Sequence, residues 1–487
     1  MKKNHFSLRG KSYALMAFAA GMMLFASCAQ DGFDEESFDI GVYNTQLEAP
    51  STDDIQVTAS ADGSKQTISW PVVYGAGGYH AILTNTSEGK VVVDSVYDGT
   101  SFAVDRIEDC NYELSLEVLG NEERNNTGCE PVVKTFSTFA TALATIPSGT
   151  DLYEYFQNNA MPNDGSELVY DLEEGGQYTV SGILDFGNHQ IQLRCTNQNN
   201  RPTITYVSKD GTAGTIRTSA PLKIKNINFD CSASDNEAIG LSETPDESIK
   251  GATGSGDYYN IMGTLHIVNC NFDGVNAQFI YDNNKKYCIE TCIIENTVVK
   301  LTSSSSSGIS GNAVIYFKSG FINTLTIKNS TFWQASTSSD AKYFVQYNNS
   351  GRSTRAGYTM NYVNFMNSTF YNIATSGQWA NYTGFGGQKS STFQMTDCIF
   401  VDCASDIARR FIGGNYNPNP TYIFDNNTYL KDAATGTYDS EENYDKSGTA
   451  IKSDPQFADP TNGDFTVNGS EQLSRRTGDP RWLPTAE

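Results

Sequence analysis

A short signature recurs seven times between residues 222 and 429 and constrains the fold more than any other feature of the chain. It has two apolar residues in alternate positions, then an Asn or Asp, then an aromatic residue or Val three positions later. Alternating apolar residues are typical of a short strand with one buried face. An Asn just before a buried side chain is typical of a tight turn. The polar residue of each signature is Asn226, Asn269, Asn296, Asn329, Asn367, Asp397 or Asn426.

A unit of this kind cannot bury its apolar face alone. Strands stacked about 4.8 Å apart let each coil cover the next, so the repeat predicts a solenoid. The polar positions are 43, 27, 33, 38, 30 and 29 residues apart. Such uneven spacing fits a parallel β-helix, in which loops absorb the extra residues. We therefore expect an all-β chain with a β-helix over residues 149–450.

The chain opens with a predicted lipoprotein signal peptide, residues 1–27. Basic residues precede an apolar run, 14–26, that is too short to span a membrane. The run ends at Ser27 and Cys28 in a sequence that resembles the lipobox of bacterial lipoproteins, which implies that Cys28 is lipidated. Residues 28–49 form an acidic tether. It resembles a signal for export to the outer face of the outer membrane, although a solvated linker is the alternative.

Residues 50–138 have a different sequence pattern, in which short stretches of alternating apolar and polar residues are separated by Gly and Asn turns. This pattern predicts a small β-sandwich. Trp70 and Tyr112 resemble positions of a fibronectin type III module, whose role here would be that of a spacer. Cys110 and Cys129 flank the last predicted hairpin, and the sequence leaves open whether they pair.

Two segments are predicted to close the ends of the solenoid. A linker, residues 139–148, leads to a short helix that Thr150 can cap, with Leu152 and Phe156 on one face. Such a helix would cover the open end of the stack, where strand edges lack partners. Residues 451–487 are expected to form a cap at the other end, with a buried Trp482.

The whole chain resembles a family of surface lipoproteins found with bacterial polysaccharide-utilisation systems. The resemblance rests on the lipobox, the fibronectin-like module and an ending with the motifs 454–457, 462–465 and 478–482. It implies a right-handed parallel β-helix of the pectin-lyase-like or pectate-lyase-like kind. It also implies that the protein takes part in glycan capture and has partner proteins in a glycan-uptake complex. It supplies no catalytic residues.

The formal net charge of −23 makes nucleic acid an unfavourable partner, because phosphate contacts need a basic surface. No Cys and His residues have zinc-site spacing. We expect a monomer that touches the membrane only through its lipid, on the outside of the outer membrane, and no cofactor other than an optional calcium ion.

A second column of predicted strands lies between the signatures. If these strands stack in register, their outward residues form a strip of aromatic, amide and basic groups suited to sugars and their carboxylates. The alternative for each aromatic residue is that it points into the core. The predicted glycan-binding residues are Tyr281, Gln346, Tyr347, Trp379, Tyr382 and Arg409.

The competing hypothesis is a polysaccharide lyase acting on a uronate-containing glycan by β-elimination. It needs a base and a group that neutralises the uronate carboxylate. Lys318 would be the base, Arg409 or Arg410 the neutralising group, and Asp282 a calcium ligand, although all four can equally be plain surface residues. The sequence patterns of polygalacturonases are missing. Binding of a plant or host polysaccharide is thus favoured over cleavage, and a structural or adhesive surface protein is the third alternative.

Overall fold

The computed structural model describes residues 41–61, 63–251, 258–302, 309, 312–335, 341–348, 357–382, 384–439 and 441–485. The chain divides after Ala140 into two compact units. The signal peptide, Cys28 and the first part of the acidic tether lie outside the described residues, so their assignment stays a prediction. Within the described residues, no helix has the length and apolar character needed to cross a membrane.

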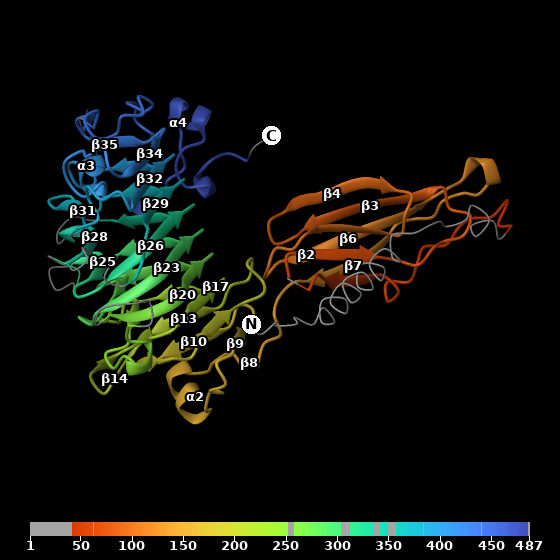
Figure 1. Cartoon of the computed structure of the whole chain (residues 1–487), viewed down its shortest axis with the longest axis horizontal. Coiled ribbons are helices and arrows are strands. Elements are labelled where there is room, and N and C mark those ends of the chain that lie inside the picture. The colour runs from red at the N-terminus through yellow and green to blue at the C-terminus, as the bar shows by residue number, and fades with distance from the viewer. Residues whose placement is uncertain are drawn as a thin grey trace, which may run out of the picture. The chain divides into compact units, whose positions relative to one another are not determined.

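The first unit contains two antiparallel sheets that share one core (Figure 1). Ile68 and Phe102 from one sheet pack with Leu83 and Leu114 from the other, around the buried Trp70. Its assignment to the fibronectin type III class stays a prediction. Within the described residues, Cys110 and Cys129 are not joined by a disulfide. One sheet contains β1 (Gln56–Ala59), β2 (Lys65–Ser69) and β5 (Ser101–Asp105), and the other β4 (Lys90–Tyr97), β3 (Gly78–Asn85), β6 (Asn111–Leu119) and β7 (Val132–Ser137); η2 (Glu122–Arg124) follows β6.

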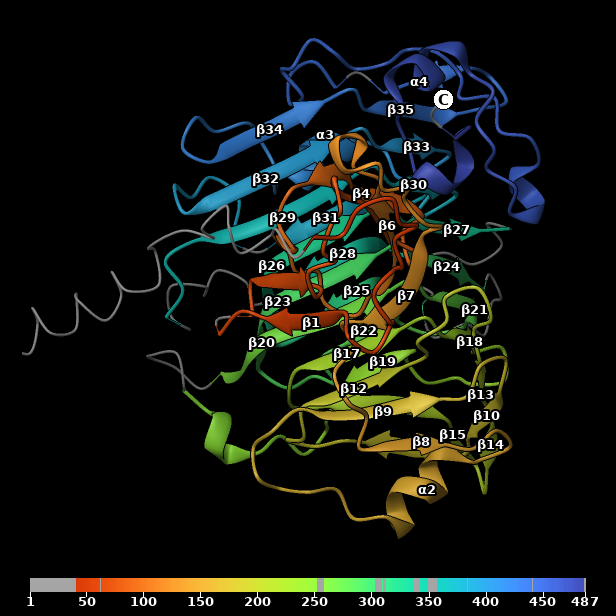
Figure 2. The same cartoon turned by 90° about the vertical axis from the view of Figure 1, so that its right-hand side faces the viewer.

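The second unit is built from three sheets, named A, B and C here, and the chain passes through them in that order on each coil up to β31 (Gln378–Tyr382); in the next coil, helix α3 (Ile407–Phe411) follows the strand of sheet B. Figure 2 shows the strands of sheet A lying one above another. Sheet A contains β8 (Ala144–Ile146), β9 (Leu168–Leu172), β12 (Ile191–Arg194), β17 (Leu222–Lys225), β20 (Tyr259–Val268), β23 (Tyr287–Glu295), β26 (Phe321–Lys328), β29 (Asn361–Met366), β32 (Ser391–Thr396) and β34 (Thr421–Asp425).

Sheet B contains β10 (Gln177–Val180), β13 (Thr203–Tyr206), β18 (Asn228–Asp230), β21 (Asn271–Val275), β24 (Val298–Leu301), β27 (Thr331–Gln334), β30 (Thr369–Tyr371), β33 (Ile399–Val401), β35 (Thr428–Asp432) and β36 (Thr437–Tyr438). Sheet C contains β11 (Ile183–Asp185), β16 (Thr215–Thr218), β19 (Ile239–Leu241), β22 (Ile280–Tyr281), β25 (Ala313–Phe317), β28 (Tyr343–Tyr347) and β31 (Gln378–Tyr382). A hairpin, β14 (Ser208–Lys209) and β15 (Thr212–Ala213), separates β13 from β16.

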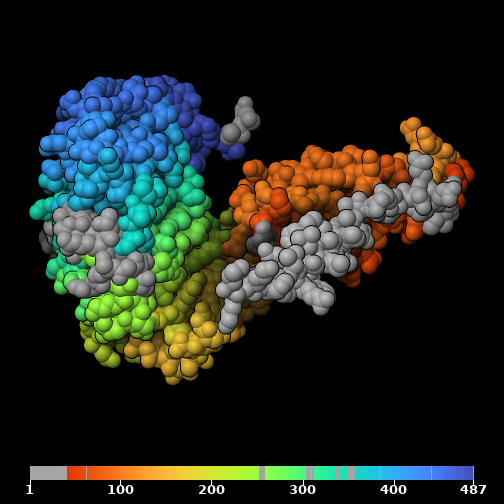
Figure 3. Space-filling model, viewed as in Figure 1, coloured from red at the N-terminus to blue at the C-terminus, as the bar shows by residue number. Residues whose placement is uncertain are grey.

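The coils are in register, which confirms the predicted parallel β-helix. Strands of sheets A and C pair in parallel throughout, and in sheet B only the last pair, β35 and β36, is antiparallel. Figure 3 shows successive coils of this unit as colour bands from yellow to blue. The first apolar residues of the seven signatures pair across neighbouring strands of sheet A: Leu222, Leu265, Cys292, Leu325, Val363, Phe393 and Tyr422.

The polar residue of every signature turns the chain from sheet A to sheet B. All seven have a left-handed backbone, with φ between 44° and 59°, a conformation that Asn and Asp tolerate better than most residues. Asn269 Nδ2 donates to Asn226 Oδ1 at 2.6 Å, and Asn426 Nδ2 donates to Asp397 Oδ1 at 3.1 Å. The aromatic residues of the signatures stack on one another in the core. The rings of Phe229 and Phe272, for example, have centroids 4.3 Å apart.

The first end of the solenoid is covered by helix α2 (Leu152–Asn158). Its cap is Asp151, which accepts a hydrogen bond from the Tyr153 amide, whereas the Thr150 hydroxyl donates to the Pro147 carbonyl. The predicted Thr150 cap is therefore wrong by one residue. Phe156 packs edge-on against Tyr170 and Phe186, ahead of the first complete coils.

The C-terminal segment packs against a side of the solenoid. The sequence had led us to expect that it covers the end of the solenoid. Phe465 contacts Trp333 and Tyr371 on the outer face of sheet B, and Trp482 lies partly buried beside it. The remaining helices are α3 (Ile407–Phe411), α4 (Ser470–Arg475), η3 (Glu247–Ile249), η4 (Pro460–Asn462) and η5 (Pro480–Trp482).

Candidate functional site

The outer face of sheet C carries one continuous row of side chains, called the sheet C row here. Each member is the register partner of the next on the neighbouring coil, and the residues on both sides of the row point into the core. Stacking thus brings together residues far apart in sequence. From Arg217 onward the row consists of Arg217, Gly240, Tyr281, Tyr316, Gln346 and Asn381, and the exposed Asp185 of β11 is the register partner of Arg217 on the preceding coil.

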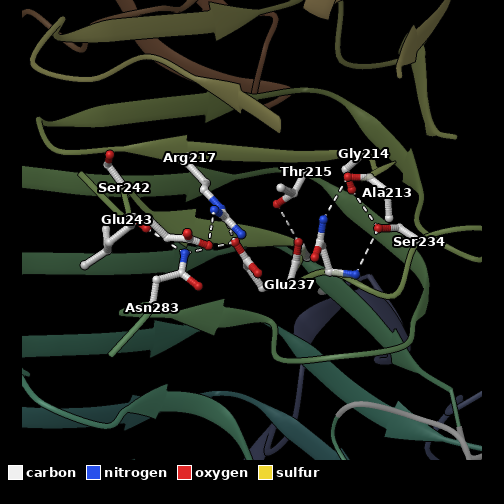
Figure 4. A network of polar contacts seen from close by, with 12 residues as sticks. Ala213, Gly214, Thr215, Arg217, Ser234, Glu237, Ser242, Glu243 and Asn283 are labelled. Atoms are coloured by element: carbon white, nitrogen blue, oxygen red, sulfur yellow. Dashed lines mark hydrogen bonds and ion pairs between the residues drawn. The ribbon is translucent and has the colours of Figure 1, made fainter. Parts of the chain in front are cut away.

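A network of ion pairs forms one end of the row (Figure 4). Arg217 Nε lies 2.7 Å from Glu237 Oε1, and Arg217 Nη1 lies 2.7 Å from Glu243 Oε1. Asn283 Nδ2 donates to Glu237 Oε1 at 3.2 Å. Burial alone would lower the pKa of Arg217, but the pairing with both glutamates raises it. Arg217 and Glu237 are buried, whereas Glu243 remains mostly exposed.

Glycine at position 240 leaves the space that this network needs. A Cβ atom there would lie 2.1 Å from Glu237 Oε1 and 2.9 Å from Arg217 Cγ. Either contact is too short for a side chain, so any other residue at 240 would push the two ion-paired groups apart. Glycine therefore allows the Arg217 and Glu237 side chains to lie across the row.

Two tyrosines form the centre of the row. The rings of Tyr281 and Tyr316 are stacked, with centroids 5.6 Å apart and planes at 18°. Because the rings face each other across neighbouring coils, their edges and hydroxyls point outward more than their faces do. Burial, and then the charge of Asp282, raise the pKa of Tyr281 to about 12, so its hydroxyl stays protonated near neutral pH.

Amide groups follow the tyrosines. Asn348 Nδ2 donates to the Tyr316 hydroxyl at 3.4 Å, and Gln346 Nε2 donates to Asn348 Oδ1 at 2.7 Å. Gln346 and Asn381 are partly exposed. From the glutamates to Asn381, the row thus offers hydroxyl, amide and carboxylate groups on successive coils about 4.8 Å apart.

Half of the residues predicted to bind glycan are buried. Tyr347, Trp379 and Tyr382 are 0%, 0% and 2% exposed, so the prediction that they line an outer groove is wrong. Trp379 stacks on Phe344 inside the solenoid, with centroids 4.6 Å apart. All three side chains point into the core, which was the alternative considered for each aromatic residue.

The residues proposed for lyase chemistry are not brought together. Arg409 and Arg410 lie on helix α3 instead of the predicted strand, and Arg409 Nη1 is 3.2 Å from Asp406 Oδ2. Helix α3 belongs to the coil after β31, whereas Lys318 follows β25, so Lys318 and Arg409 are three coils, or about 14 Å, apart. One bound sugar ring would not meet both.

Asp282 has a structural role instead of the predicted metal-binding one. Its carboxylate is fully buried and accepts hydrogen bonds from the amides of Ser319 at 2.7 Å, Gly320 at 2.9 Å and Asn284 at 2.9 Å. Burial raises its pKa to about 6. In the described part of the chain, no three His, Cys, Asp or Glu side chains group closely enough to hold a metal ion.

Several members of the site were missed by sequence reasoning: Arg217, Glu237, Glu243, Asn283 and Asn348. The one available signal was Arg217, a charged residue between Ile216 and Thr218 in a strand-like stretch. A charged residue in a strand needs a partner of opposite charge when the residues before and after it are buried. Both of its partners come from loops, which no periodic pattern reveals.

Three family models match successive parts of the chain, and each is described as a domain of unknown function. They are DUF4992 over residues 1–176, DUF4957 over 176–335 and DUF5123 over 363–482. No curated protein matches the chain.

Two pectate lyases are among the solved structures to which the chain is similar. Pectate lyase Pel3 from Pectobacterium carotovorum is 12% identical, with 71% of this chain and 84% of that one covered and a TM-score of 0.16. Pectate lyase PelI from Erwinia chrysanthemi, in complex with tetragalacturonic acid, is 11% identical, with 67% and 87% covered and a TM-score of 0.15. At this identity and TM-score, no argument about this chain rests on the likeness.

Proposed function

We propose that this protein binds polysaccharide along the sheet C row. The observation that supports this proposal is the row itself, in which Tyr281, Tyr316, Gln346 and Asn381 lie in register and partly exposed on four successive coils. Tyrosine hydroxyls and side-chain amides both donate and accept hydrogen bonds. A ligand rich in hydroxyl groups and extended along the solenoid axis would therefore meet one such group per coil.

The carboxylates beside the row favour binding over cleavage. Hydrolysis needs a protonated acid and a free carboxylate on either side of the scissile bond. Glu237 and Glu243 are both held by the single Arg217 guanidinium, 2.7 Å from each. The lyase hypothesis lacks a base and a neutralising cation within reach of one sugar ring, because Lys318 and Arg409 are separated by three coils.

The cellular setting of this proposal comes from the sequence. Lipidation of Cys28 would anchor the protein to the outer membrane, and the first unit would serve as a spacer between the membrane and the β-helix. In that position, the sheet C row could retain a polysaccharide for a glycan-uptake complex.

Affinity electrophoresis through gels containing one polysaccharide each, drawn from a panel of plant and host glycans, tests the proposal. Tyr316→Ala removes one hydroxyl and one ring from the centre of the row. Tyr362→Ala is the matched control, since Tyr362 is a partly exposed tyrosine on sheet A. We expect retardation of the wild type by at least one glycan, about tenfold weaker binding by Tyr316→Ala, and no change in the control.

Two results would contradict the proposal. Equal retardation of Tyr316→Ala and the wild type would show that sugar binds elsewhere. No retardation in any gel would favour the structural or adhesive alternative.

A further inference from the structure

A second polar site lies on another side of the solenoid, at the turns that lead from sheet A to sheet B. It is a cleft of about 640 Å³, bounded on one side by Pro480 and Arg481 of the C-terminal segment. Asn269 and Asn296, two of the signature residues, and Asn228 and Asn271 of sheet B line the opposite side together with Arg201. None of these side chains belongs to the sheet C row.

Arg201 is a partly buried cation without an ion-pair partner among the described residues. Its Nε donates to the Gln198 carbonyl at 3.0 Å, and its Nη2 donates to Asn269 Oδ1. A guanidinium has five N–H donors. The other donors of Arg201, including both on Nη1, have no acceptor in the described part of the chain, so they are available to a ligand.

Arg481 supplies a second guanidinium to the same cleft. Its Nε lies 3.2 Å from Asp479 Oδ2, which leaves Nη1 and Nη2 without a protein acceptor within the described ranges. The Asp479 carboxylate also accepts hydrogen bonds from the Thr331 hydroxyl at 2.8 Å and from the Arg481 backbone amide at 3.1 Å, so it does not interact with the Arg481 guanidinium alone. Burial lowers the pKa of Arg201, and the nearby positive charge of Arg481 lowers it further.

The net charge of the cleft has the opposite sign to the net charge of the whole chain. Two arginines and one aspartate leave an excess positive charge there, in a protein with a net charge of −23. Arginine binds oxyanions in a planar, two-point geometry that matches carboxylate and sulfate oxygens. The surrounding amides, such as Asn271, whose Nδ2 donates to Asn228 Oδ1 at 3.1 Å, suit hydroxyl groups.

We propose that this cleft binds a saccharide that carries an oxyanion, with the carboxylate or sulfate between Arg201 and Arg481 and the sugar hydroxyls against the asparagines. The proposal does not rest on the function of the sheet C row. The sheet C row has its only arginine engaged by two glutamates, and so it has no comparable preference for an anion.

Calorimetry on the full-length protein tests the cleft. Three probes are compared: a hexuronate trisaccharide, a sulfated trisaccharide and a neutral trisaccharide. The variants are Arg201→Gln and Arg481→Gln. Arg476→Gln is the matched control, because Arg476 is exposed in the same segment and, among the described residues, its guanidinium donates to the Pro484 carbonyl alone.

We expect at least one charged probe to bind at least tenfold more tightly than the neutral probe, and the preferred probe identifies the oxyanion. Arg201→Gln and Arg481→Gln should each weaken that binding about tenfold or more, and Arg476→Gln should leave it unchanged. Added salt should weaken binding of the charged probe, since the contact is ionic and partly exposed.

Two outcomes would overturn the proposal. One is equal affinity for charged and neutral probes. The other is unchanged affinity for the charged probe in both Arg201→Gln and Arg481→Gln. Because Arg481 is exposed, its variant remains informative if Arg201→Gln fails to fold. Tyr316→Ala with the neutral probe reports on the sheet C row separately, so failure of one site is distinguishable from failure of the other.

Discussion

Two buried carboxylates, those of Asp282 and Glu441, accept hydrogen bonds from backbone amides. Asp282 holds the chain after β25 through the amides of Ser319 and Gly320. Glu441 does the same for helix α3, since its Oε2 accepts a hydrogen bond from the Ala408 amide at 3.1 Å. Burial, and then the charge of Asp439, raise the pKa of Glu441 from its ordinary 4.5 to about 8.

Glu441 should make stability depend on pH. Because its pKa is higher in the folded state, its contribution is fully present below about pH 4.5 and is lost as pH rises through about 8. Glu441→Gln keeps the shape but does not ionise. We expect the Tm of the wild type to fall relative to Glu441→Gln by several degrees between pH 5 and pH 9, measured by scanning calorimetry. Parallel Tm curves for the two proteins would contradict the assignment.

At the scale of elements, the turn from sheet A to sheet B sets the register of the seven coils that carry the signature. Asn329 has φ of 49°, a backbone that costs most L-residues about 1–2 kcal/mol. Asn and Gly adopt it more readily. The signature therefore fixes where one strand ends and the next begins, which is why the pattern can be recognised in the sequence.

The Asn329 turn can be tested without disturbing the core. Asn329→Ala should lower the free energy of unfolding by about 1 kcal/mol, because alanine must adopt the left-handed backbone. Asn329→Gly is the control and should change it by much less. Urea denaturation followed by circular dichroism measures both. Equal losses in the two variants would mean that the Asn side chain, and not its backbone, stabilises the turn.

Sequence reasoning predicted sheet A and sheet B well and sheet C poorly, for a physical reason. Sheets A and B meet at a turn that requires an Asn or Asp, and their strands keep simple alternation. In sheet C, two neighbouring residues ahead of the outward one are both buried: Phe344 and Val345 in β28, and Trp379 and Ala380 in β31. The sequence prediction placed the neighbours Gln346 and Tyr347 on one outer face, together with Trp379, whereas only Gln346 of the three is partly exposed.

The candidate site was only partly predictable for the same reason. Tyr281 and Gln346 could be proposed because they lie in strands of sheet C. Glu237, Glu243 and Asn348 lie in loops, and only the fold brings them to the row. Arg201 and Arg481 are 280 residues apart in sequence and meet only because the C-terminal segment folds back along sheet B.

At the scale of the whole molecule, the C-terminal segment stabilises the upper coils from the side. Trp333, Tyr371, Ile399 and Leu430 on the outer face of sheet B would be exposed without it. Phe465 is fully buried among them. The segment thus covers the apolar part of sheet B and also provides one wall of the cleft that contains Arg201.

Phe465→Ala should loosen this segment. Removing a buried phenylalanine costs about 3–5 kcal/mol, so we expect faster proteolytic cleavage within residues 454–485. Leu483→Ala, at a partly exposed position, is the control and should have a much smaller effect. Limited proteolysis with mass spectrometry locates the cuts. Equal cleavage of Phe465→Ala and the wild type would show that Phe465 does not hold the segment in place.

In our proposal, the stacked coils bring Tyr281, Tyr316, Gln346 and Asn381 together as one sugar-binding surface. A crystal structure with the oligosaccharide of the most strongly retained glycan tests this surface. We expect sugar rings along the sheet C row, with hydrogen bonds to the tyrosine hydroxyls and the amides. Sugar bound only in the first unit, or an unoccupied row at saturating ligand, would contradict it.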